Sequence, residues 1–420
     1  MRDKPDVVKE DLARRRQEEK IVWVDDILAN DKKWRSILQQ ANRLREQRNK
    51  ITQEIAALKK KRVDTSKKLR EAEEIPDKIK KLEVEADEVK AKVDEYLKRL
   101  PNLLHSAVPF GKDEDDNQEI RRWGAQPKFD FEPSDHIDLG LKQDLIELDR
   151  AAEVAGKRFY YLRNDLVRLN YALIQFGLDL LREEGFQLFQ TPYMLRRPVV
   201  EGATDFATFE DAIYEVKDED LCMIPTSEYA LLAYHREEII DGKLLPLRYG
   251  GISPCFRKEA GAHGRDTKGI FRVHQFEKVE QFIFCRPEQS EAEHEHLIKN
   301  AERFFQIISI PYRVVEVCTG DIGAVASRKL DIETWLPGQG KYREAVSCSN
   351  CTSYQAARSK VRFRDKPQDD PRYVHTLNST LVATERALVA IIENYQQKDG
   401  TVLVPEALRP YLGGQKAIGS

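Results

Sequence analysis

The 420-residue chain lacks several features that mark large classes of protein. No apolar run approaches the roughly 18 residues that cross a membrane. The first thirty residues carry acids and bases in place of the apolar core of a signal peptide. Internal repeats and low-complexity segments are missing as well. We therefore expect a cytoplasmic globular protein of two or three domains.

Cysteine is scarce and scattered. Six cysteines along a chain of this length form no small-domain disulfide framework, which favours reduced thiols. Cys348 and Cys351 have the spacing of half a zinc site, but a structural zinc needs four ligands. The other four stand singly in apolar, strand-like segments: Cys222, Cys255, Cys285 and Cys318. The pattern predicts buried thiols and no bound zinc.

The chain also has no large excess of charge of one sign. Lys+Arg 69 nearly balance Asp+Glu 72, which leaves a net charge of -3. A polyanionic partner would therefore have to bind a local basic surface. Hydrophobic residues make up 41% of the chain, which is enough for a sizeable core.

Two helical patterns dominate the first hundred residues. Apolar positions recur in steps of three and four over residues 34–62 and again over 75–100, which is heptad spacing. Proline is accepted in the first turn of a helix but not in its interior, so we expect the second helix to begin at Pro76. The chain would then reverse between Val63 and Pro76, and Pro101 would end the second helix. The prediction is an antiparallel coiled-coil hairpin.

Basic residues gather toward the turn of this hairpin. Residues 41–70 hold eleven bases and three acids, a net charge of plus eight. A solvated coiled-coil surface is the ordinary explanation of a basic helix, but a two-helix arm has too little core to justify its length. A surface that follows a phosphate backbone explains the pattern better. The bases that we expect to contact RNA are Arg43, Arg48, Lys50, Lys59, Lys60, Lys61 and Arg62.

A polar, linker-like run over residues 110–132 follows the hairpin, so we place a domain boundary near residue 110. This divides the chain into residues 1–110 and 111–420. Beyond the run, residues 166–180 repeat as the buried face of a helix that stops at Gly185, and a strand over 186–192 continues it. On its residues alone, this helix–strand unit is either ordinary core or a dimer interface.

The first of two segments with clear chemistry begins at Phe256. Arg257 and Glu259 alternate as on a strand, a turn rich in glycine and charge follows, and residues 271–284 return as a second strand. Alternation with period two places an aromatic ring, a cation and a carboxylate on one face of that strand. These side chains are Phe276, Lys278 and Glu280.

The second segment lies more than a hundred residues further on. The polar run Asn378-Ser379-Thr380 leads into an apolar periodic stretch over residues 381–395, which predicts a helix. Arg386 lies one turn inside it. From that position a guanidinium could reach over a bound polyphosphate.

These two segments resemble motifs 2 and 3 of the class II aminoacyl-tRNA synthetases, and further signatures narrow the resemblance to the seryl-tRNA synthetase family. They follow in the family's order: Thr226-Ser227-Glu228, residues 274–280, residues 335–339, Tyr342-Arg343-Glu344 and residues 347–351. The resemblance runs from about residue 34 to 405, and the loop over residues 261–269 is similar to that of the archaeal and eukaryotic branch. It implies an α+β fold, in which helices flank an antiparallel catalytic sheet and a coiled-coil hairpin precedes it.

The resemblance also implies roles in ATP binding. Activation builds charge on the α-phosphate while pyrophosphate leaves, so fixed cations and Mg²⁺ are needed at both ends. Arg257 would hold the α-phosphate, whereas Arg386 would hold the γ-phosphate and cover adenine opposite Phe276. Glu259 would contact the base edge, and Glu344 with Ser347 would bind Mg²⁺. The expected ATP set is Arg257, Lys258, Glu259, Val273, Phe276, Glu344, Ser347 and Arg386, and the expected catalytic set is Arg257, Glu280 and Arg386.

The implied serine pocket needs an anion for the ammonium and polar groups for the hydroxyl. Glu280 would supply the charge, while Thr226, Glu228 and Thr380 would contact the amine and the hydroxyl. Thr226 also suits a helix N-terminus, and both roles can hold together. The expected serine-binding set is Thr226, Ser227, Glu228, Arg257, Glu280, Asn378 and Thr380.

The resemblance thus implies activation of L-serine with ATP and transfer to tRNA(Ser), with tRNA(Sec) as a further acceptor in the family. The arm would grip the long variable arm of the tRNA, Arg265 would also contact the tRNA, and the helix–strand unit would form a homodimer. A synthetase-like binding or regulatory protein is the main alternative, but loss of Arg257, Glu280 or Arg386 would mark it. A ligase that loads a carrier protein would not need the basic arm.

Overall fold

The computed structural model describes residues 1–205, 211–259 and 269–419. The chain forms two compact units, Met1–Pro101 and Asn102–Ser420, so the units divide several residues before the boundary expected near residue 110. Among the described residues, no helix is both long enough and apolar enough to cross a membrane.

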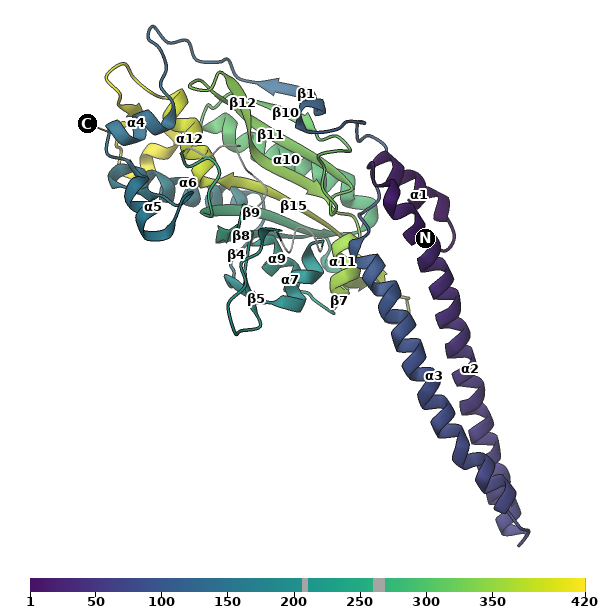
Figure 1. Ribbon diagram of the computed structural model, residues 1–420. Coiled ribbons are helices and arrows are strands. Elements are labelled where there is room, and N and C mark those ends of the chain that lie inside the picture. The colour runs from purple at the N-terminus through teal and green to yellow at the C-terminus, as the bar shows by residue number, and fades with distance from the viewer. Residues whose placement is uncertain (206–210, 260–268, 420) are drawn as a thin grey trace. The chain divides into compact units, whose positions relative to one another are not determined.

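The first unit is a helical hairpin. The short helix α1 (Pro5–Arg14) precedes two long ones, α2 (Ile21–Lys60) and α3 (Ser66–Arg99), which lie side by side (Figure 1). At about 1.5 Å per residue, the forty residues of α2 span about 60 Å. The predicted heptads are confirmed, because the following apolar positions are buried: Ile37, Ala41, Ile51, Ile55, Ile75, Ile79, Ala86, Val89, Val93 and Leu100.

The predicted start of the second helix is wrong. Helix α3 begins at Ser66, ten residues before Pro76, which lies in its interior. Pro76 is exposed, so the carbonyl of Ala72 that lacks a partner can bond to water. Ile75 and Ile79 on the buried face pack in one cluster with residues of α2, and this packing outweighs a local cost of about 3 kcal/mol.

The second unit is built on an eight-stranded sheet in the order β1-β10-β11-β12-β15-β9-β8-β4. All neighbouring strands are antiparallel except β4 and β8, which are parallel. The strands span β1 Gln118–Trp123, β4 Gln187–Gln190, β8 Leu247–Phe256, β9 Gln275–Cys285, β10 Tyr312–Glu316, β11 Arg328–Leu336, β12 Lys341–Asn350 and β15 His375–Ala383. The predicted α+β fold is therefore confirmed.

Three long helices cover one face of this sheet: α6 (Asn164–Glu183), α10 (Ser290–Ile307) and α12 (Thr384–Asn394) (Figure 1). Their buried side chains and those of the strands form the main core. Helix α6 ends before Gly185, whose φ of 79° favours glycine, and β4 follows, as predicted.

Short elements complete the unit. The helices are α4 His136–Lys142, α5 Asp149–Ala155, α7 Arg197–Ala203, α9 Glu228–Ala233 and α11 Tyr354–Ser359. The remaining strands are β2 Ile146–Glu147, β3 Tyr161–Leu162, β5 Met194–Arg196, β6 Leu221–Met223, β7 Ile239–Asp241, β13 Arg362–Arg364, β14 Arg372–Tyr373, β16 Val402–Leu403 and β17 Ala417–Ile418. Residues of α7, α9 and α11 form a second core with Phe282 and Phe284 of β9.

Three predicted boundaries need correction. The run expected to be a linker contains β1, which is polar in sequence but pairs with β10, and Trp123 stacks on Tyr312 at 5.8 Å between ring centroids. The returning strand β9 begins at Gln275, not at residue 271. The helix that carries Arg386 begins at Thr384, because residues 375–383 pair with β9 and β12 as strand β15.

Candidate active site

Cross-strand pairing gathers polar side chains on the sheet face opposite the three long helices. Asp331 of β11 pairs with Ser347 of β12, and Ser349 of β12 pairs with Asn378 of β15. Residues directly opposite each other in neighbouring strands share a face of the sheet. The chemistry-bearing side chains of these strands therefore lie on one face, although they are far apart in sequence.

A β-bulge in β12 explains how Glu344 joins this face. Positions three apart on a regular strand point to opposite faces, so Glu344 and Ser347 would not share one. Here Val346 pairs with Ile332 and Glu344 with Glu333, which leaves Ala345 as an extra residue. The bulge turns Glu344 to the same face as Ser347, which joint binding of one cation by the two residues would require.

Two cavities lie on this face. The first has a volume of about 410 Å³, and its lining includes Thr226, Glu228, Arg257, Glu259, Lys329, Ser347 and Asn378. The second has a volume of about 580 Å³, and its lining includes Phe271, Arg272, Asp331, Arg343, Glu344 and Arg386. Eight of the fourteen residues predicted to bind ATP or serine thus line one cavity or the other.

Arg257 follows directly after β8 and extends over the neighbouring strand. Its guanidinium carbon lies 5.2 Å from the centre of the Phe276 ring, and its Nε donates to the carbonyl of Pro225 at 3.3 Å. Phe276 shares its face of β9 with Lys278 and Glu280, as the alternation predicted. The first cavity therefore has a fixed cation at its edge, held by a ring and a carbonyl.

Two acidic side chains lie at the first cavity: Glu228 lines it, and the buried Glu280 contacts the lining residue Thr226. Glu280 is 1% exposed and forms an ion pair with Lys278, while Thr226 Oγ1 donates to Glu280 Oε2 at 3.5 Å. Glu228 accepts hydrogen bonds from Asn378 at 3.1 Å and from Gln355 at 2.6 Å. Burial, with the nearby charge of Glu280, raises the pKa of Glu228 to about 7.

Thr226 lies next to the start of α9 and also lines the first cavity. Its hydroxyl accepts the backbone N–H of Glu228 at 3.2 Å. Capping of this kind satisfies a helical N–H that would otherwise lack a partner. It also fixes the direction in which Glu228 leaves the helix.

Two ion pairs lie at the second cavity, and one of them includes Glu259 of the first cavity. Arg386 pairs with the Glu344 carboxylate at 2.9 Å, and Arg272 pairs with Glu259 at 2.7 Å. Burial opposes ionisation of Glu344, but the charge of Arg386 prevails and lowers the pKa of the carboxyl. The side chain is 45% exposed, so solvent weakens this effect. Glu259 also has a φ of 50°, which is rare outside glycine and typical of functional sites.

Some predicted residues are not brought to a cavity wall. Ser227 is fully buried, and its Oγ faces Gly251, where an added Cβ would lie 2.7 Å away. Four further predicted residues are buried without lining either cavity: Val273, Phe276, Glu280 and Thr380. Lys258 donates its backbone N–H to Ala212, a lining residue, at 3.0 Å. Arg265 lies outside the described residues.

Our sequence analysis did not identify an ion pair on β11. Lys329 lines the first cavity and Asp331 the second, and their side chains are 3.1 Å apart. Asp331 is 4% exposed, and its Oδ1 has no hydrogen-bond partner. Alternation of Lys329, Asp331 and Glu333 before the Trp335 signature is the signal that could have identified them.

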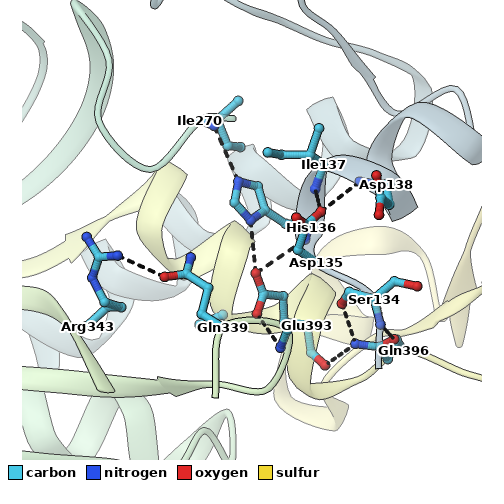
Figure 2. A network of polar contacts seen from close by, with 12 residues as sticks. Ser134, Asp135, His136, Ile137, Asp138, Ile270, Gln339, Arg343, Glu393 and Gln396 are labelled. Carbon is cyan, nitrogen blue, oxygen red and sulfur yellow. Dashed lines mark hydrogen bonds and ion pairs between the residues drawn. The ribbon is translucent and has the colours of Figure 1, made fainter. Parts of the chain in front are cut away.

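A second missed feature is the buried network in Figure 2. Glu393 of α12 accepts the backbone N–H of His136 at 3.2 Å, its Nδ1–H at 2.9 Å and the N–H of Gly338 at 2.9 Å. The N–H of Ile270 donates to His136 Nε2 at 3.4 Å. The network therefore joins α4 and α12 to Ile270. The next residue, Phe271, lines the second cavity.

The ring of Phe271 packs against two guanidinium groups that line the second cavity. The guanidinium carbons of Arg343 and Arg386 lie 4.5 Å and 5.0 Å from its ring centre. Arg343 also donates to Gln339 at 2.8 Å, as Figure 2 shows. Stacking on an aromatic face suits a guanidinium better than an ammonium, so the ring fixes both planes.

The six cysteines are free thiols and all are buried, as predicted. Within residues 1–205, 211–259 and 269–419, no group of three or more His, Cys, Asp or Glu side chains could hold a metal ion. The candidate ligands for Mg²⁺ are oxygen atoms of different types. Glu344 and Ser347 share a sheet face with Asp331, whose Oδ1 has no hydrogen-bond partner. Hard oxygen ligands of this type suit Mg²⁺.

Comparison with protein families gives two matches. A family described as the tRNA synthetase class II core domain (G, H, P, S and T) matches residues 209–395. A second, described as the seryl-tRNA synthetase N-terminal domain, matches residues 1–104.

Curated relatives and solved structures extend the likeness to the whole chain. Serine–tRNA ligases of Pyrococcus horikoshii and Nitrosopumilus maritimus are 52% and 50% identical, covering 100% of this chain and 96% and 99% of those proteins. The crystal structure of the Pyrococcus horikoshii enzyme complexed with ATP aligns with a TM-score of 0.94 over 100% of this chain and 98% of the other. Cytoplasmic serine–tRNA ligase of Naegleria fowleri in complex with AMP, 34% identical, aligns with a TM-score of 0.88 over 99% and 96%.

Proposed function

The chain belongs to the seryl-tRNA synthetases, class II enzymes that join serine to tRNA, and we propose that the polar face of its sheet carries out both steps of that reaction. The observation that supports this most directly is the convergence of Arg257, Glu344 and Arg386 on two adjoining cavities of one sheet face. One cavity would hold serine and the other the nucleotide.

The first cavity suits an amino acid with a hydroxyl side chain. Glu228 and the buried Glu280 offer negative charge for the ammonium, and Thr226 and Asn378 offer groups for the hydroxyl. Arg257 at its edge would pair with the serine carboxylate. Thr380, directly opposite Glu280 on β15, would support the same pocket from below, and Ser227 would contribute through its backbone.

The second cavity suits a triphosphate. Arg386 would bind the γ-phosphate, and Arg257 the α-phosphate across the boundary between the cavities, with Phe276, Val273, Lys258 and Glu259 arranged around the base. Glu344 and Ser347 would hold Mg²⁺, which neutralises charge that develops on the phosphates. Arg386 and Glu344, now paired with each other, would then each turn to the nucleotide.

The chemistry needs positioning more than proton transfer. The ionised serine carboxylate attacks the α-phosphorus, a new carboxyl O–P bond forms, and the bond to the β-phosphate breaks to release pyrophosphate. Arg257 stabilises the charge on the α-phosphate as it grows. A ribose hydroxyl of the tRNA end then attacks the acyl carbon, and AMP leaves.

The division of labour between the units is part of the proposal. The unit of residues 1–101 would bind the long variable arm of tRNA(Ser) through its exposed bases, and the remainder would be the catalytic domain. We further propose a homodimer through α6 and β4, with a cytosolic location. The acceptor end of the tRNA would reach the polar face of the sheet, Arg265 would contact the tRNA, and tRNA(Sec) would be a further substrate.

Serine-dependent exchange of pyrophosphate into ATP tests the first step. We expect exchange with serine and rejection of alanine by roughly 10⁴, because buried polar groups such as Glu228 would be left unpaired. Arg257→Ala should slow exchange by about 10² to 10³, as for loss of one preorganised donor. The same substitution at Arg150, an α5 side chain that is 81% exposed, is the control. Equal rates for Arg257→Ala and wild type would refute the assignment.

A further inference from the structure

His274 makes three hydrogen bonds to backbone groups, two of them to Arg257. Its carbonyl accepts the N–H of Arg257 at 2.9 Å, and its ring Nδ1 lies 2.8 Å from the carbonyl oxygen of Arg257. Its own N–H donates to the carbonyl of Arg158 at 3.2 Å. His274 therefore contacts both the backbone N–H and the backbone carbonyl of Arg257, which is the first residue after β8.

The chemistry of these partners fixes the tautomer of His274. A carbonyl oxygen can only accept, so Nδ1 must carry the proton that it donates to Arg257. The hydroxyl oxygen of Tyr214 lies 3.1 Å from the same nitrogen and must accept as well. Phe159 contacts the ring at 5.1 Å between centroids, which restrains its plane. The imidazole is thus held as a directed N–H donor.

From this geometry we propose that His274 is a positioning residue that holds the backbone of Arg257, so that the guanidinium meets the reacting phosphate and carboxylate. This inference rests on the proposed function of Arg257. Arg257 lies one residue beyond the end of β8, and its Nε donates to the carbonyl of Pro225 at 3.3 Å. A misplacement of about 1 Å near reacting atoms can cost about 10² in rate.

A matched pair of substitutions isolates the N–H from the bulk of the ring. In Asn the amide nitrogen is as many bonds from Cα as Nδ1 is in His, so His274→Asn keeps the donor. His274→Leu has the same branching without it. We expect His274→Leu to lower kcat for serine-dependent exchange by about 10 to 10², with a smaller change in KM for ATP, and His274→Asn to restore most of the rate.

Tyr214→Phe is the control for the shared nitrogen. It removes the hydroxyl beside Nδ1 but leaves the bond to the Arg257 carbonyl. We expect nearly wild-type exchange. A loss as large as that of His274→Leu would overturn the assignment, because it would mean that Tyr214 donates to Nδ1. If His274→Leu does not fold, His274→Gln, whose amide lies one bond further out, takes its place.

A double-mutant cycle separates this inference from the proposed function. The readout is the affinity for the seryl-adenylate analogue seryl sulfamoyl adenosine, measured by titration calorimetry. If His274 acts through Arg257, His274→Leu weakens binding in the wild type but adds nothing in Arg257→Ala. Full additivity overturns the positioning role alone. Unchanged affinity of Arg257→Ala itself refutes the role proposed for Arg257.

Discussion

At the scale of the residue, Glu228 shows how burial sets the working charge of the proposed serine pocket. Two amides, those of Asn378 and Gln355, donate to one of its oxygens, yet burial raises the pKa of the carboxyl to about 7. An ammonium that enters the cavity would favour the ionised form. Glu228 is therefore poised between charged and neutral states in the absence of such a cation.

This charge balance predicts how serine affinity depends on pH. Serine should bind the ionised form of Glu228, so its KM should rise about tenfold per unit as the pH falls below about 7, and level off above it. Pyrophosphate exchange measured from pH 5.5 to 8.5 tests this. Glu228→Gln should give a high KM that no longer depends on pH. A steep profile that persists in that variant would place the titration on another group.

Prediction of individual site residues from the sequence was limited to those that a pattern within one local segment could place. Phe276, Lys278 and Glu280 could be placed because alternation on a single strand determines which face each side chain occupies. For Lys329 and Asp331, alternation gives only a shared face of β11, and the pairing of β11 with β12 is what brings that face to the site. His136 and Glu393 are 257 positions apart, and no local pattern joins them.

At the scale of the element, helix periods were predicted better than helix ends. Heptads and the α6 stripe report packing directly, so the buried positions followed from them. The start of α3 and the existence of β1 did not follow, because tertiary contacts override proline in one and polar composition in the other. The bulge at Ala345 is a further case, since the register of two strands defines it.

Pro76 makes a prediction about α3. It is an exposed interior proline, so Pro76→Ala restores an N–H for the Ala72 carbonyl without disturbing Ile75 or Ile79. The substitution should stabilise the arm by about 1 to 3 kcal/mol, which hydrogen exchange of residues 66–99 in the full-length protein would show as slower opening. Glu74→Ala, two residues away and also exposed, is the control. Faster exchange in Pro76→Ala would mean that proline favours the native helix.

At the scale of the whole molecule, the net charge is near zero, but one part of the N-terminal hairpin is strongly basic. The arm holds a net charge of plus eight over residues 41–70, and the rest of the chain more than offsets it. Lys59, Lys60, Lys61 and Arg62 are all exposed. Throughout the described part of the chain, no salt bridge is formed by any of these four side chains. They are therefore available for a polyanion.

Reversal of that cluster should weaken tRNA(Ser) binding selectively. Each phosphate contact contributes about 0.7 to 0.9 to the slope of log affinity against log salt, so changing Lys59, Lys60, Lys61 and Arg62 to Glu should flatten the slope by up to about 3. Pyrophosphate exchange should stay unchanged, because the sheet face is untouched.

The control separates local from global charge. Changing Lys78, Lys80, Lys81 and Lys92 of α3 to Glu alters the net charge by the same amount at exposed positions away from the turn. If both variants lose the same affinity and slope, the effect belongs to the charge of the whole molecule and the arm has no dedicated contact. Binding of a tRNA without a long variable arm should respond little to either change, since nothing in it would reach residues 59–62.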